Sequence, residues 1–198
     1  MLIIGFFSLT VCSQTLSDLF YLLPDQFAYD LTINTRKELI KNKSAAQIIF
    51  NDDSTYFDLV SFDEKNGYVE FSSSHMESSW EMCYWKNSSG SILVGVSQPR
   101  DMSKKLFFFW IKDGKATYPT NDVLRGLSIY YFAKPNAKIS DIDEELCGGL
   151  SYTLPRKGVN IICKIGWTCD EKTESFLLGD KCELLWEDGH FEFGKPYF

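Results

Sequence analysis

Cysteine is the residue whose type and spacing in this chain point most directly to a chemistry. Four of the six cysteines fall in the last third of the sequence: Cys147, Cys163, Cys169 and Cys182. In an oxidising compartment they predict two disulfides, but four cysteines allow three pairings and the sequence does not choose among them. Their spacing does not fit zinc, because no Cys-x-x-Cys or paired His accompanies them. We therefore expect disulfides here, with no metal and no cofactor.

Nucleophilic and acid–base catalysis have few other candidates. Cys83 lies in an apolar strand pattern, which raises a thiol pKa and indicates a core residue. His75 stands in a serine-rich stretch without a Gly-x-Ser-x-Gly motif, and His190 follows a predicted hairpin turn. We assign none of the three a catalytic role.

Carboxylates offer a second chemistry, that of an extracytoplasmic hydrolase. Its candidates, which the sequence does not rank, are Glu77, Glu81, Asp141 and Asp143. Glycoside hydrolysis depends on the separation of two carboxyl groups, which is a three-dimensional quantity. The acidic run that begins at Asp141 lacks the Gly and the spaced terminal Glu of an EF-hand, so it indicates a solvated loop.

The tryptophans could form an aromatic surface for a glycan or a peptide. They are Trp80, Trp85, Trp110, Trp167 and Trp186. Because side chains alternate along a strand, Trp80 and Trp85 fall on opposite faces, and at most part of the set can serve one surface. Core packing is therefore the favoured interpretation.

Residues 1–13 have the pattern of a signal peptide. They carry no charge, and their apolar run of about ten residues is half of what a bilayer span needs. The small Ser13 predicts cleavage before Gln14. Cys12 also permits lipidation, although Val11 stands where a smaller residue is usual. We expect an exported protein of the periplasm or the cell surface, without a membrane span, either free or lipid-anchored.

Residues 14–198 have the length of a single domain. A hydrophobic content of 44% with 16% aromatic residues is typical of a β-rich core. The net charge of −7 belongs wholly to this part and argues against nucleic acid as a partner.

Helices are expected at the start of this domain and once in its middle. Thr15 or Ser17 caps a helix over 18–22, and Asn34 caps another over 35–41. A longer helix over 121–132 begins at Thr120 or Asn121. Its apolar stripe consists of Val123, Leu124, Leu127 and Tyr131.

Strands follow from the period-two alternation and from turn pairs such as Asn66-Gly67 and Asp188-Gly189. They are expected over 48–50, 55–62, 68–71, 80–85, 92–96, 106–111, 116–118, 150–154, 159–165, 182–186 and 191–193. The segment 106–111 has no polar face, which predicts a central strand covered on both sides. The predicted fold is α+β, a large and mostly antiparallel meander of about ten strands covered by the 121–132 helix and two short N-terminal helices.

The chain resembles a group of small exported Bacteroidetes-type proteins that form a domain-of-unknown-function family. The resemblance rests on Leu16–Phe20, Leu23–Asp25, Thr35–Ile40, Trp80–Trp85 and Leu154–Gly158, and is strongest over 14–45. It implies a periplasmic or outer-surface location and assigns no catalytic residue.

Together these patterns favour a noncatalytic binding or envelope-structural module whose ligand is a protein, a peptide or a glycan. The missing catalytic constellation and the abundance of aromatic strand positions motivate this prediction. The alternative is the hydrolase that uses acidic residues.

Overall fold

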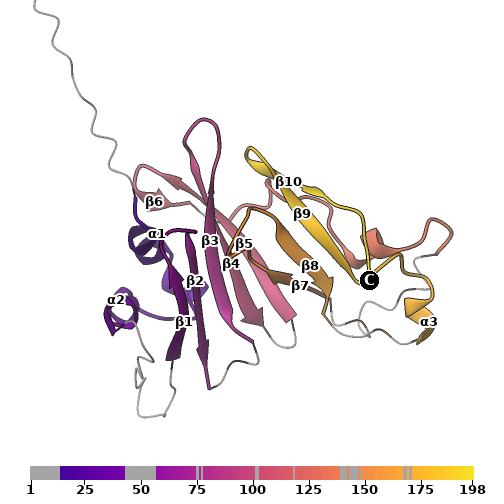
Figure 1. Cartoon of the computed structure of the whole chain (residues 1–198), viewed down its shortest axis with the longest axis horizontal. Helices are drawn as coiled ribbons and strands as arrows, with labels where there is room; N and C mark the ends of the chain where they lie inside the picture. The colour runs from indigo at the N-terminus through magenta and orange to yellow at the C-terminus, as the bar shows by residue number, and fades with distance from the viewer. Residues whose placement is uncertain are drawn as a thin grey trace, which may run out of the picture.

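A computed structural model arranges the chain in three layers: N-terminal helices, a first sheet and a second sheet (Figure 1). It describes residues 14–42, 57–74, 76, 78–100, 103–117, 119–138, 142, 147, 149–166, 169 and 171–198. Several predictions concern residues outside these ranges: the signal segment 1–13 with Cys12 and Ser13, the strand over 48–50, His75, Glu77, Asp141, Asp143 and Trp167.

The first sheet is a six-stranded antiparallel meander in which each strand pairs with the next along the chain. Its strands are β1 (Phe57–Asp63), β2 (Tyr68–Ser73), β3 (Trp80–Lys86), β4 (Ile92–Arg100), β5 (Ser103–Lys112) and β6 (Lys115–Ala116). The turn between β5 and β6 places Asp113 and Gly114 at φ values of 50° and 69°, as a type I′ hairpin requires.

The second sheet contains four antiparallel strands in the order β10-β9-β8-β7. They are β7 (Leu150–Thr153), β8 (Ile161–Ile165), β9 (Lys181–Glu187) and β10 (His190–Phe193), with the short helix α3 (Glu171–Glu174) between β8 and β9. The prediction of ten antiparallel strands in an α+β fold is therefore confirmed, but the strands divide into two stacked sheets.

Three short helical elements cover the outer face of the first sheet: α1 (Leu16–Leu22), the 3₁₀ turn η1 (Asp25–Phe27) and α2 (Ile33–Asn42). Thr15 caps α1, because its hydroxyl accepts the Asp18 N–H while the Asp18 carboxylate accepts the Thr15 N–H. The second helix begins two residues earlier than expected. Thr32, rather than Asn34, accepts a hydrogen bond from the Thr35 N–H at 3.3 Å.

The reciprocal cap of α1 predicts a pH-dependent contribution to stability. The Thr15 N–H and then its hydroxyl lower the pKa of Asp18, so this contribution is complete above about pH 4 and is lost as the pH falls through the lowered pKa. Asp18→Asn is expected to reduce the free energy of unfolding by about 0.5 kcal/mol at pH 7, since the site is exposed. Urea unfolding at pH 7 and pH 3 tests this, and the difference should be smaller at pH 3.

Glu38→Gln is the matched control for this cap, because Glu38 is exposed on α2. It is expected to change the free energy of unfolding by less than about 0.5 kcal/mol. An Asp18→Asn effect that is equally large at pH 3 would contradict the pH dependence.

The predicted main helix over 121–132 is wrong in most of its length. Only η2 (Ile129–Phe132) is helical, as a single 3₁₀ turn, and residues 121–128 form turns and bends. Gly126 has φ +76°, which a right-handed helix excludes, and Ser128 is extended at φ −144°. The apolar stripe nevertheless packs inward, since Val123 is buried and its stripe neighbours contact the same core.

Two cores lie on the two faces of the first sheet. On the helix side, Phe71 stacks on Trp80 with their ring centroids 4.6 Å apart. Between the sheets, Trp85 and Phe108 pack against residues of the second sheet. β5 contributes Phe109 to the first core and Phe108 to the second, which confirms that this strand is covered on both faces.

Candidate functional site

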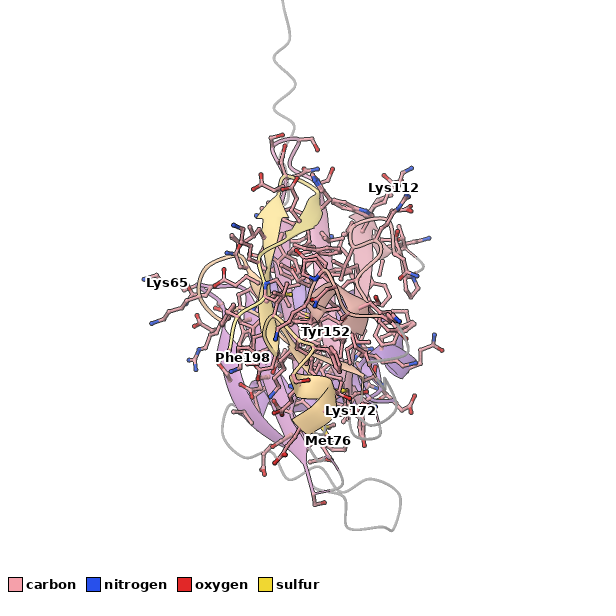
Figure 2. The ribbon with its side chains drawn as sticks, turned by 90° about the vertical axis from the view of Figure 1, so that its right-hand side faces the viewer. Lys65, Met76, Lys112, Tyr152, Lys172 and Phe198 are labelled. Carbon is pink, nitrogen blue, oxygen red and sulfur yellow. A yellow bond between two sulfur atoms is a disulfide. The ribbon has the colours of Figure 1, made fainter. Side chains whose placement is uncertain are left out.

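A groove of about 420 Å³ lies where β5, β7 and the turns over 121–128 meet. Its lining consists of Ser103, Lys104, Lys105, Leu106, Phe108, Asn121, Leu124, Gly126, Leu127, Ser128, Leu150 and Tyr152. Figure 2 looks from the side of the second sheet and labels Tyr152 near the middle of the molecule. The segment that the sequence predicted as a covering helix therefore forms one wall of a cavity.

Lys104 connects this groove to a buried set of polar contacts, which we call the polar junction and define as Glu81, Ser97 and Lys104. The Lys104 ammonium lies 2.7 Å from Glu81 Oε1, and the second oxygen of Glu81 accepts the Leu154 N–H at 2.6 Å. The Ser97 hydroxyl donates to the Tyr152 carbonyl at 2.7 Å. The polar junction thus connects β3, β4 and β5 of the first sheet to β7, which contains Tyr152, and to Leu154, which directly follows β7.

The charges of the polar junction are almost completely removed from water. Glu81 is 4% exposed and Lys104 is 9% exposed. Burial raises the pKa of the Glu81 carboxyl, while Lys104 and the Leu154 N–H oppose that shift. Because desolvation offsets much of the attraction in a buried ion pair, we expect the junction to fix the docking of the two sheets more than to add stability.

Of the four hydrolase candidates, only Glu81 belongs to the described residues. Glu70 lies opposite it on β2 and accepts a hydrogen bond from the Tyr68 hydroxyl at 3.2 Å. Neither carboxylate lines the groove. Both oxygens of Glu81 are hydrogen-bonded within the protein, to Lys104 and to the Leu154 N–H.

The cysteines of the last third separate into a bonded pair and a reduced pair. Cys147 and Cys169 form a disulfide. Cys163 and Cys182 lie opposite each other on β8 and β9 and are free thiols, as is Cys83 on β3. Burial raises the pKa of Cys83, in agreement with its interpretation as a core residue.

The tryptophans within the described ranges serve the two cores. Trp80 belongs to the helix-side core and Trp85 to the core between the sheets, so their predicted opposite orientation is confirmed. Trp110 and Trp186 pack against that second core. His190 is exposed at the start of β10, with its ring 3.8 Å from the Glu192 carboxylate.

Two features of the described residues concern metal ions and membranes. Within the ranges given above, His, Cys, Asp and Glu side chains do not gather in threes that could hold a metal ion. Among the same residues, helices are too short or too polar to cross a bilayer.

Sequence reasoning missed the groove and two members of the polar junction, Ser97 and Lys104. One signal for Lys104 was present, because it shares its strand parity with Leu106 and Phe108, whose side chains face the second sheet. A lysine on an inward-facing position predicts a buried partner. The position of that partner, 23 residues away on β3, was not encoded in any local pattern.

Comparisons of the chain with protein-family models, with curated proteins and with solved structures found no match.

Proposed function

We propose that this chain is a noncatalytic binding module whose groove between β5, β7 and residues 121–128 holds a small amphiphilic ligand with an uncharged polar group. The observation that carries this proposal is the combination, in one groove, of neutral hydrogen-bonding side chains with a cluster of leucines. The exported location expected from residues 1–13 stays part of the proposal.

The size and the lining of the groove support a small ligand. Small-molecule sites range from roughly 300 to 1,000 Å³ and combine apolar walls with a few polar groups. The apolar wall here is made by Leu106, Phe108, Leu124, Leu127 and Leu150. A hydrocarbon portion of a ligand would replace water against these side chains.

The polar side chains of the groove support an uncharged polar group on that ligand. Lys104 is neutralised by Glu81, and Lys105 shares its strand parity with Phe107 and Phe109, so its side chain points to the helix side of the sheet. Asn121 and Ser128 add groups to the groove that can donate and accept hydrogen bonds. A hydroxyl or amide group would therefore find neutral partners at one place.

Binding of decanol, with decanoate as its charged counterpart, tests the proposal. We expect decanol to shift the amide NMR signals of groove residues and to bind more tightly than decanoate. Asn121→Ala is expected to weaken decanol binding about fivefold, the effect of losing one hydrogen bond of about 1 kcal/mol. Leu127→Trp, which fills the groove, is expected to weaken decanol binding as well.

Lys112→Ala provides the matched control, because Lys112 is an exposed lysine of β5 outside the groove (Figure 2). It should leave the affinity for decanol unchanged. Tighter binding of decanoate than of decanol, or equal losses in the Asn121 and Lys112 variants, would refute the proposed groove site.

A further inference from the structure

Cys163 and Cys182 occupy directly opposite positions on the adjacent antiparallel strands β8 and β9. The Ile165 N–H donates to the carbonyl of Asp180 at 2.9 Å, so these two residues form a hydrogen-bonded pair. Hydrogen-bonded and non-hydrogen-bonded pairs alternate along an antiparallel ladder, and the cysteines stand two positions away from Ile165 and Asp180. Cys163 and Cys182 therefore also form a hydrogen-bonded pair. Its Cα atoms are expected to lie about 5.5 Å apart, which is within the range that a disulfide spans.

The two side chains also point toward the same side of the sheet. Residues directly opposite each other in an antiparallel ladder share a face, and both cysteines are fully buried in the core between the sheets. Their thiols are hydrogen-bonded to each other, which raises the pKa of Cys163 and lowers that of Cys182. The sulfur atoms therefore already contact one another in the reduced state.

We propose that Cys163 and Cys182 form a second disulfide, which joins β8 to β9, in the compartment where the Cys147–Cys169 disulfide forms. A compartment that oxidises one cysteine pair also oxidises another pair whose sulfur atoms are in contact. Cys83 lies in the first sheet, opposite Tyr68 and Gly95, and is therefore not a cross-strand neighbour of either cysteine.

The oxidant in this step is a disulfide, such as oxidised glutathione or an exchange-active protein disulfide. The Cys182 thiolate attacks one sulfur of the oxidant and forms a mixed disulfide, releasing the first oxidant thiol. Cys163 then loses its proton and attacks the Cys182 sulfur, which releases the second oxidant thiol. Two protein thiols are oxidised and one disulfide is reduced, and the burial of both cysteines places the exchange before the sheets close.

Tryptic mapping of the full chain tests this bond. Trypsin cuts after Lys and Arg and places Cys147, Cys163, Cys169 and Cys182 in four separate peptides, which cover 139–156, 158–164, 165–172 and 182–198. The chain is refolded in a mixture of oxidised and reduced glutathione, denatured, alkylated with iodoacetamide without reduction, and digested. We expect peptide 158–164 to be linked to 182–198, and 139–156 to be linked to 165–172.

Recovery of 158–164 and 182–198 as separate alkylated peptides, beside an intact link between 139–156 and 165–172, would overturn the proposal. A link from Cys163 to Cys147 or Cys169 would overturn it as well. Cys83→Ser is expected to leave both links in place. Cys163→Ser is expected to leave Cys182 alkylated and the other link unchanged, which separates a specific loss from a general failure to fold.

Discussion

Glu81→Ala is expected to lower the free energy of unfolding by about 3–5 kcal/mol, the usual cost of removing one partner from a buried ion pair. The substitution leaves the Lys104 ammonium without its counter-charge in a site where that side chain is 10% exposed. It also removes the acceptor of the Leu154 N–H, which is a second buried polar group. Urea unfolding followed by tryptophan fluorescence measures the loss.

A double-variant cycle separates the pair from the packing around it. Lys104→Met alone leaves the Glu81 carboxylate buried and unpaired, whereas Glu81→Leu combined with Lys104→Met removes both charges. The double variant is expected to be more stable than Glu81→Ala, because a buried ion pair can often be replaced by apolar side chains at little cost. A loss below about 1 kcal/mol for either single variant would contradict a desolvated polar junction.

Arg36→Met is expected to lower the free energy of unfolding by about 3 kcal/mol or more. Arg36 is 1% exposed, and its guanidinium donates to the Phe20 and Leu23 carbonyls at 2.6 and 2.8 Å and to the Asp25 carboxylate at 2.6 Å. The two carbonyls belong to the end of α1, where the helix itself supplies no donors. Each buried carbonyl that loses its partner costs about 1–3 kcal/mol.

Arg36→Lys extends this test, because a single ammonium cannot reproduce the planar fork that reaches three acceptors. It is expected to recover only part of the loss. Lys41→Met is the matched control on the same helix, since Lys41 is exposed, and it should change stability by about 0.5 kcal/mol or less. Equal effects of Arg36→Met and Lys41→Met in urea unfolding would show that the guanidinium does not join α1 to α2.

The local sequence was sufficient wherever the determining contacts are between near neighbours. The strand segments followed from period-two alternation, and the opposite orientation of Trp80 and Trp85 followed from the same rule. Thr15, one of the two predicted caps, forms its cap with Asp18 within one turn of helix, although α1 begins two residues earlier than expected. The turn at Asp113-Gly114 likewise depends only on backbone preferences of its own residues.

The failure over 121–132 shows where a local pattern misleads. The helical spacing of the apolar residues was real, since Val123 is buried, but apolar spacing reports which side chains face the core and not the backbone that presents them. Gly126 adopts a positive φ, and its neighbours Leu124 and Leu127 pack against the core between the two sheets. That packing created the groove.

The chain by itself thus determined its antiparallel strands, its hairpin turns and the first of its helices, because each depends on residues close together in sequence. Only the tertiary structure decided that the strands divide into two stacked sheets. The tertiary structure also decided that Lys104 is the partner of Glu81, Cys169 the partner of Cys147, and Cys182 the neighbour of Cys163. These pairs depend on which strands lie side by side and which faces meet, and that is a property of the folded core as a whole.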